Sequence, residues 1–482
     1  MNQSGNSFWD RIPLPALIGI WVLAIVVGAY LVASAFFNTP VVPVNTQVAS
    51  ANTPASGSDV DTVANPTLAP GAGQNVVPTS SAPTAAPASG SEPTPANVGG
   101  APAAQPQPTV PPLQDPEMEF GIQSNAITGD PAYTMKLIQE RLLLGWVKQQ
   151  LRWGDFSPAP GQMDWSGFDG VINEASKRGL RVMLSIVTAP QWSHPNLQPT
   201  TDDPGAVSGP PDDLNAYAQF VGEVVDRYQG KIHAIEIWNE QNIDSEWRTN
   251  PQVVSPERYV EMLKLAYQMI KSKDPNIIVI GGALSPTGFF GGGCSEKGCD
   301  DQPYLRRMTD LGFLNYADCV GVHVNGYNFP PDKRHDEGYN DPTAKFRGPF
   351  DPPPAGNPHP SWSFRSTLED YYAITGQQKK LCVTEFGWAS YEDISTTALR
   401  TYEYGLDNTA QEQADWDAQA FSLMREWGFV KLAFLFNLDF AQKSPLGAQD
   451  RTAPWSITHL DGSERPALRS IRRFMKEVIG IP

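Results

Sequence analysis

The distribution of apolar residues divides the chain into three regions. Residues 14–37 form an uncharged, mostly apolar run, whereas residues 38–113 lack aromatic side chains. From residue 119 onward, short apolar stretches alternate with longer segments of helical periodicity. Such alternation is typical of a parallel sheet whose strands are connected by helices. Because it repeats eight times, it predicts an α/β fold, the (β/α)8 or TIM barrel, over residues 114–482.

The predicted strands are short apolar runs, and the predicted helices fill the segments between them. Proline at a first helical position, as in Asp130-Pro131 and Ser255-Pro256, marks helix starts. Strands are expected at residues 120–124, 147–152, 181–187, 232–238, 277–281, 320–324, 381–384 and 432–436. Helices are expected at residues 131–144, 165–178, 213–228, 256–273, 303–311, 364–374, 410–427 and 466–479.

The apolar run at residues 14–37 is long enough to cross a bilayer, which takes about 20 residues. Arg11 precedes it, and no Lys or Arg follows before Lys136. The positive-inside rule therefore predicts a cytoplasmic segment 1–13, a single transmembrane helix at 14–37 and an extracellular remainder at the cell membrane. A cleaved signal peptide is the alternative, because Ala33-Ser34-Ala35 is similar to a cleavage site.

Residues 38–113 are rich in Pro, Ala, Ser and Thr. Such a segment buries too little apolar surface to offset its chain entropy, so we expect a disordered linker between membrane and barrel. The formal net charge of −17 argues against nucleic-acid binding. Six histidines and four cysteines show no metal-binding spacing, so neither a metal nor a cofactor is expected.

Two glutamates follow predicted strands in distinctive contexts. The fourth strand ends in Trp238-Asn239-Glu240, and the seventh in Thr384-Glu385-Phe386-Gly387-Trp388. TIM barrels carry their sites at the carboxyl ends of the strands, so both carboxyl groups should meet at one mouth. Paired carboxyl groups are the chemistry of glycosidic-bond hydrolysis. Strict strand alternation would turn Asn239 away from Glu240, so both reach the site only if the strand ends or bulges there.

These motifs resemble those of the clan A glycoside hydrolases, retaining (β/α)8 enzymes that include cellulase-type and xylosidase-type families. The resemblance covers the chain from residue 120 to its end and implies that Glu240 is the acid/base and Glu385 the nucleophile. It matches Arg152 to an arginine at the end of strand two, and His323 with Tyr327 to a histidine and tyrosine at strand six. This implies a polysaccharide or oligosaccharide substrate.

The chain departs from the clan pattern at two strand ends. Phe436-Asn437-Leu438 stands where the clan usually has a tryptophan after strand eight, and Thr188-Ala189-Pro190-Gln191-Trp192 replaces a histidine that many members carry after strand three. The clan therefore leaves the sugar, its linkage, and endo or exo action open. The oligomeric state is open as well.

Further binding residues are expected around the two glutamates. Arg152 should reach Glu385 and keep that carboxylate ionised. Asn239 should bind the sugar 2-hydroxyl. Trp192, Trp238 and Trp388 come just after strand ends, where an aromatic face suits the C–H face of a sugar ring, although core packing is the alternative.

The same alternation makes predictions inside the barrel. Lys148 and Glu236 lie four residues before Arg152 and Glu240, so both should face inward and pair, either directly or through water. Cys319 lies four residues before His323 and Cys382 three before Glu385, so alternation places the two cysteines on opposite sides of the sheet. They should therefore not form a disulfide. Cys294 and Cys299 bracket four residues after a Gly-rich run, and a local disulfide is expected there, with two free thiols as the alternative.

Together these features favour a membrane-anchored, extracytoplasmic glycoside hydrolase that cleaves O-glycosidic bonds with retention. One rival interpretation is a catalytically inactive barrel that binds carbohydrate at the cell surface. A barrel lyase or isomerase is a second rival, but it would normally need a metal or phosphate site that the sequence does not offer.

The boundary near residue 113 makes a first prediction. A chain that begins there should remain soluble and fully active, because the predicted core and both glutamates lie beyond it. Turnover of a panel of nitrophenyl glycosides and β-glucans, compared with that of the whole chain, measures this. Recovery of aggregated protein alone would contradict the boundary.

Overall fold

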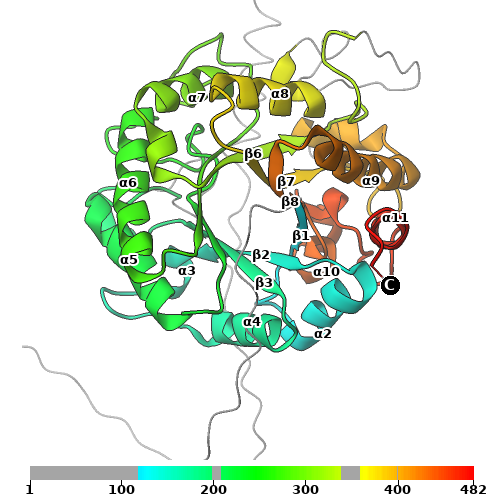
Figure 1. Ribbon diagram of the computed structural model, residues 1–482, viewed down its shortest axis with the longest axis horizontal. Helices are drawn as coiled ribbons and strands as arrows, with labels where there is room; N and C mark the ends of the chain where they lie inside the picture. Colours follow the sequence, from blue (N-terminus) through cyan, green and yellow to red (C-terminus); the bar gives the residue numbers. More distant parts are fainter. Residues whose placement is uncertain (1–117, 198–207, 338–358, 399, 482) are drawn as a thin grey trace, which may run out of the picture. The chain divides into compact units, whose positions relative to one another are not determined.

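The computed structural model describes residues 118–197, 208–337, 359–398 and 400–481. Eight parallel strands close into a barrel in the order β1 to β8, with β8 paired to β1. Helices form a ring around the strands (Figure 1), which confirms the predicted TIM barrel. The strands are β1 Glu119–Gln123, β2 Trp146–Arg152, β3 Arg181–Val187, β4 Ala234–Ile237, β5 Ile278–Leu284, β6 Cys319–Asn325, β7 Leu381–Gly387 and β8 Val430–Leu435.

The outer helices follow the strands as the apolar periodicity predicts. Several begin at side-chain caps: Ser255 accepts from the Arg258 amide, and Thr409 with Glu412 forms a complete capping box. The main helices are α2 Pro131–Lys136, α4 Ser166–Lys177, α5 Leu214–Arg227, α6 Pro256–Lys273, α7 Asp301–Asp310, α8 Phe364–Ile374, α9 Ala410–Trp427 and α11 Pro466–Glu477. Short helices are η2 Leu137–Leu142, α3 Trp153–Phe156, η3 Gln191–Ser193, η4 Phe313–Tyr316, η5 Pro360–Trp362, η6 Arg400–Leu406, α10 Phe440–Lys443, η7 Gly447–Gln449 and η8 Ala453–Trp455.

The barrel has two apolar regions separated by its wall. Outward-facing strand residues pack under the helices, and a smaller cluster fills the interior. Burial on both faces explains why the strands read as near-continuous apolar runs. The inner cluster comprises Trp146, Met183, Ala234, Ile278, Ile280, Cys319, Cys382, Leu432 and Phe434.

A disulfide joins Cys319 on β6 to Cys382 on β7, so the prediction that these residues cannot bridge is wrong. The reason is an irregularity in β7. Its register against β6 runs from Val322↔Val383 directly to His323↔Glu385, so β7 contains one residue more than β6 at this point. Because of the extra residue, two positions of β7 that are three residues apart can face the same side of the sheet. Cys382 and Glu385 therefore both face the barrel interior.

The predicted transmembrane helix at 14–37 and the linker at 38–113 lie outside the described residues. Within the described part of the chain, no helix is both long and apolar enough to span a membrane. The described structure begins at residue 118, just before β1.

The Cys319–Cys382 crosslink should stabilise the barrel by restricting the unfolded chain, because it closes a loop of 63 residues. Replacing both cysteines by alanine should lower the free energy of unfolding by about 2–4 kcal/mol in urea titrations. The Cys294→Ala/Cys299→Ala pair is the control: its separation is 5 residues, so its loss should be roughly 2 kcal/mol smaller. Equal losses for the two pairs would contradict this account.

Candidate active site

The fourth strand ends at Ile237, and the backbone then leaves the extended conformation. Trp238 and Glu240 have φ values of 73° and 45°, which non-glycine residues rarely adopt. Because the strand ends at Ile237, its alternation does not force the side chains of Asn239 and Glu240 to opposite faces. Both can therefore reach the site, which was the condition stated from the sequence. Such backbone conformations persist only where the surroundings hold them, and they cluster at functional sites.

Glu385 lies within β7, and its carboxyl group meets the side chain of Lys148 from β2. Lys148 Nζ lies 2.8 Å from Glu385 Oε1 and donates a second hydrogen bond to the Thr384 carbonyl oxygen at 3.1 Å. The side chain of Glu385 is 14% exposed and that of Lys148 is fully buried. The nucleophile candidate is therefore held from below by a buried ammonium group.

The predicted pair between Lys148 and Glu236 is confirmed. Lys148 Nζ lies 3.4 Å from Glu236 Oε2, and both side chains are fully buried. Ser185 of β3 donates a hydrogen bond to the same carboxylate oxygen. Sequence parity did not reveal that Lys148 also contacts Glu385, because parity gives the face of a strand and not which groups meet across the barrel.

His323 of β6 lies between the two glutamates at the mouth. Its Nδ1 atom is 3.1 Å from Glu240 Oε1 and 3.8 Å from Glu385 Oε2. On its other side, Nε2 lies 3.9 Å from Glu236 Oε1. Because the first two distances both start at His323 Nδ1, Glu240 Oε1 and Glu385 Oε2 are at most about 7 Å apart, which is the sum of the two distances.

Opposite charges determine how these groups ionise. Burial opposes the charge of Glu385, but the neighbouring His323 and Lys148 outweigh it and lower the pKa of this carboxyl group. Burial likewise opposes the charge of Lys148, but Glu236 and Glu385 raise its pKa. The pKa of His323 is raised because Glu385 and the bond to Glu240 outweigh its burial. The site thus contains two basic side chains, those of Lys148 and His323, among the carboxyl groups of Glu236, Glu240 and Glu385.

Asn239 is buried and faces the same mouth. Its Oδ1 atom accepts a hydrogen bond of 3.3 Å from Gln150 Nε2 of β2. Gln150 lies two residues after Lys148, so both belong to the inward face of β2. Sequence reasoning passed over Gln150, although the same alternation that placed Lys148 could have found it.

Arg152 does not form the expected contact with Glu385. Its Nε atom pairs with Asp155 Oδ2 of the short helix α3 at 2.9 Å. The position beneath the nucleophile candidate is taken by Lys148, which lies four residues, or two inward positions, earlier on β2. Arg152 remains at the carboxyl end of β2, where its charge acts on Glu246.

Two of the three tryptophans proposed as sugar platforms are core residues. Trp238 and Trp388 are fully buried, and their indole N–H groups donate to the carbonyl oxygens of Glu246 and Phe329, each at 2.9 Å. A Cβ atom on Gly326 would lie 1.7 Å from the Trp388 ring, so that ring occupies space which only glycine leaves free. The sequence predicted that both tryptophans lie near strand ends, but it did not predict that their rings turn into the core.

Trp192 is half-buried. Its ring packs edge-on against Trp153, with centroids 5.5 Å apart, and its N–H donates to the Ser157 carbonyl oxygen. The residue is thus partly accessible near the end of β3, and its ring is held against the segment after β2.

Tyr327 follows β6 and belongs to an aromatic cluster on the β6–β8 side of the mouth. It is buried, and its ring lies 4.9 Å from that of Tyr404. Phe436, which stands where the clan has a tryptophan, is half-buried beside Trp455 at 6.2 Å. The buried members of this cluster are Tyr327, Trp362, Ala389, Tyr404 and Trp455.

A fourth carboxyl group, near the acid/base candidate, was not expected from the sequence. Glu246, six residues after Glu240, accepts a hydrogen bond from Ser208 Oγ at 3.2 Å. Burial and the charge of Glu240 raise the pKa of Glu246 to about 7, against the opposing charge of Arg152. Its closeness to Glu240 depends on the loop after β4, which no periodicity describes.

Comparison with known proteins identifies the fold. No family model matches the chain. Among solved structures, a family 39 glycoside hydrolase from Bacteroides cellulosilyticus WH2 is 18% identical with a TM-score of 0.53, over 76% of this chain and 64% of that one. This chain thus spans slightly less than two thirds of that structure. The likeness to this structure confirms the (β/α)8 barrel.

Two further neighbours have lower scores. A family 39 β-xylosidase from Caulobacter crescentus is 14% identical with a TM-score of 0.48, covering 76% of this chain and 72% of that one. Xylanase 10B from Thermotoga petrophila RKU-1, in complex with xylobiose, is 15% identical with a TM-score of 0.46, covering 75% of this chain and 95% of that one.

In the described ranges, no three His, Cys, Asp or Glu side chains are grouped so as to hold a metal ion.

The buried triad of Lys148, Glu236 and Glu385 makes a stability prediction. Lys148→Met should lower stability by about 3–5 kcal/mol, because it leaves two carboxylates without their shared cation. Thermal and urea unfolding measure this. Lys297→Met, at an exposed lysine, is the matched control. Lys148→Met combined with Glu236→Gln should cost less than the sum of the single changes. An unchanged thermal midpoint in Lys148→Met would contradict the pairing.

Glu246 makes a prediction for pH dependence. Its pKa is about 7 in the folded protein against an ordinary 4.5, so the folded state holds this proton more tightly. The stability it contributes is present below about pH 4.5 and is lost as pH rises through about 7. Glu246→Gln should therefore reduce the fall in thermal midpoint between about pH 5 and pH 8. Glu223→Gln, at an exposed glutamate of α5, should leave the fall as in the unaltered protein.

Proposed function

We propose that the protein is a glycoside hydrolase that cleaves O-glycosidic bonds of a poly- or oligosaccharide by retention. The observation that carries the proposal is the meeting of Glu240 and Glu385 on His323, with Lys148 beneath Glu385. Two carboxyl groups in different surroundings, one held ionised and one more exposed, are what double displacement at a glycosidic bond requires.

In the first step, a Glu385 oxygen attacks the anomeric carbon and the bond to the leaving oxygen breaks. Glu385 is suited to this role because Lys148 and His323 keep its carboxylate ionised. Glu240, with 21% of its side chain exposed, gives its proton to the leaving oxygen. Its Oε1 atom lies against His323 Nδ1, which fixes the direction of the carboxyl group.

Double displacement requires that Glu240 carry a proton when the substrate binds and lose it as the glycosyl ester forms on Glu385. Negative charge thus passes from Glu385 to Glu240 in the first step, and His323 lies beside both carboxyl groups. A site whose net charge is unchanged by the step avoids the cost of an uncompensated buried charge.

In the second step, Glu240 removes a proton from water, whose oxygen attacks the anomeric carbon and breaks the ester bond to Glu385. In this proposal Asn239, whose side chain accepts a hydrogen bond from Gln150, binds the sugar 2-hydroxyl. Carboxyl groups of retaining enzymes lie about 5–5.5 Å apart and those of inverting enzymes about 6.5–9.5 Å. The upper limit of about 7 Å leaves little of the inverting range and so favours retention.

We also propose that the enzyme works outside the cytoplasm, anchored by residues 14–37. All four cysteines lie in the described part of the chain and all are in disulfides, which persist in oxidising compartments. In this proposal the apolar run anchors the protein in the membrane, and residues 38–113 link that anchor to the barrel.

The roles of the two glutamates are separable by kinetics. Glu385→Gln should abolish turnover of every substrate, because no carboxylate remains to attack. Glu240→Gln should spare the first step for substrates with an activated leaving group. Added azide should then rescue the second step by attacking the glycosyl ester, which gives a glycosyl azide with the same anomeric configuration as the substrate. Single-turnover kinetics and NMR of the products measure these outcomes.

Glu223→Gln serves as the control, since it removes an exposed carboxyl group of α5 and should leave turnover unchanged. An inverted product would overturn the retaining mechanism even with both glutamates essential. Sugar binding without hydrolysis by the unaltered protein would favour the non-catalytic carbohydrate-binding barrel instead.

A further inference from the structure

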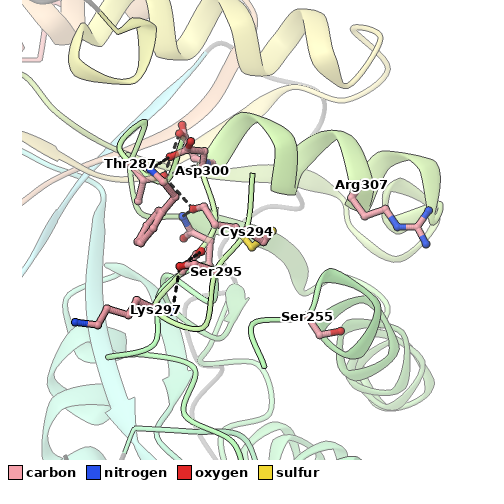
Figure 2. The surroundings of a disulfide bond; sticks show 12 residues. Ser255, Thr287, Cys294, Ser295, Lys297, Asp300 and Arg307 are labelled. Carbon is pink, nitrogen blue, oxygen red and sulfur yellow. Dashed lines mark hydrogen bonds between the residues drawn. A yellow bond between two sulfur atoms is a disulfide. The ribbon is translucent and has the colours of Figure 1, made fainter. Parts of the chain in front are cut away.

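The loop between β5 and α7, residues 285–300, folds back onto the segment that carries Glu240. Figure 2 shows the disulfide of Cys294 in this loop, with Thr287 and Asp300 beside it and Lys297 pointing away. The predicted Cys294–Cys299 bond is thus formed. Cys294 is exposed and Cys299 is fully buried, so the bond runs from the surface into the protein.

Asp300 fixes the shape of the first half of the loop. Its carboxylate accepts hydrogen bonds from the amides of Gly288, Phe290 and Gly292 at 2.8, 2.8 and 2.6 Å. The second half is a tight turn in which the Ser295 amide donates to the Gly298 carbonyl oxygen at 2.7 Å. Residues 294–297 are exposed, so the disulfide replaces apolar burial as the anchor of this turn.

The turn pairs with the chain just after Glu240. The Cys299 amide donates to the Asn242 carbonyl oxygen at 2.7 Å, and the Asp244 amide donates to the Lys297 carbonyl oxygen at 2.9 Å. Between these bonds, residue 243 and Gly298 form an antiparallel bridge. A Cβ atom on Gly298 would lie 2.9 Å from the Asn242 carbonyl oxygen, so the two segments are in close contact.

Asn242 ties both ends of the loop to the same segment. Its Nδ2 atom donates to the Ser285 and Cys299 carbonyl oxygens at 2.9 and 3.2 Å, and its Oδ1 atom accepts from the Ser285 amide at 2.8 Å. The side chain is fully buried. Glu240 lies two residues earlier and donates its own amide to the Ala283 carbonyl oxygen of β5 at 2.9 Å.

We infer that the Cys294–Cys299 turn and Asn242 are positioning elements for the general acid/base Glu240. Beyond the end of β4, Glu240 has a φ of 45°. Its amide still bonds to Ala283 of β5, but its carbonyl oxygen accepts from the amide of residue 243, so its direction also depends on what holds residues 241–244. The turn holds them through the two backbone bonds and the bridge. This inference rests on the proposed function.

A positioning role for the acid/base has a kinetic signature that general loss of stability lacks. Protonation matters most when the leaving group is a poor one, because an activated phenolate departs without a proton. A misdirected Glu240 should therefore slow the first step selectively for substrates with basic leaving groups. Misplacement of a catalytic group by about 1 Å can cost on the order of a hundredfold.

The experiment compares kcat/KM for aryl glycosides of graded leaving-group basicity in the 482-residue chain. For the Cys294→Ser/Cys299→Ser variant, kcat/KM with the most basic leaving group should fall roughly ten- to a hundredfold. With a dinitrophenyl leaving group it should stay within about twofold. Asn242→Asp should give the same pattern, because it replaces the donor to two carbonyl oxygens by an acceptor.

Asn315→Asp is the matched control. Its Nδ2 atom also donates to a backbone carbonyl oxygen, that of Gly312, but it lies before β6 at the opposite end of the barrel. It should leave the dependence on the leaving group unchanged. An equal fall for every leaving group, or no fall, in both test variants would overturn the inference.

Hydrogen exchange followed by mass spectrometry separates this inference from the proposed function. The amides of Glu240 and Asp244 should exchange faster in the disulfide variant than in the unaltered protein, while those of β7 stay protected. Unchanged exchange at Glu240 and Asp244 would overturn the inference, whether or not the unaltered protein hydrolyses any glycoside. Absence of hydrolysis by the unaltered protein would count against the proposed function alone.

Discussion

The ammonium group of Lys148 determines the charge arrangement of the barrel mouth. It is fully buried and contacts Glu236 and Glu385 at once. Either carboxylate alone in this interior would be very costly, and a lysine alone would be equally so. The three groups are therefore tolerable only together, and the ionised state of Glu385 follows from this mutual dependence. His323 extends the arrangement upward to Glu240.

The two glutamates are supported in different ways. Glu385 belongs to a strand paired on both sides, and a local irregularity against β6 sets the direction of its side chain. Glu240 lies past the last paired residue of β4 and depends on a loop from the next strand. The sheet thus fixes the nucleophile candidate, whereas loops fix the acid/base candidate. Loops vary more readily than strands, so the proton donor is the part of the site more open to change.

Sequence patterns predicted the parts of this structure that depend on periodicity. The eight strands, their order, the placement of both glutamates at strand ends and the Lys148–Glu236 pair all follow from alternation and spacing. Patterns failed where the backbone departs from regularity. One extra residue in β7 reversed the parity of Cys382, and positive φ at Trp238 accompanies a ring that lies in the core.

Two contacts between distant segments of the barrel mouth were not predicted by these patterns. Lys148 rather than Arg152 meets Glu385 because of depth along β2, and depth is not visible in a one-dimensional pattern. Glu246 approaches Glu240 through a loop with no period. Neither outcome was determined by residue type, since each depends on how far a side chain reaches across the barrel mouth.

The Cys319–Cys382 bond has a consequence for proteolysis. It spans 63 residues, including the whole connection from β6 to β7. A single cut by a protease anywhere in that connection would produce two fragments that remain covalently joined until the disulfide is reduced. His323 and Glu385 would stay on neighbouring strands tied at their base, so a nicked molecule would keep the two halves of its site in register.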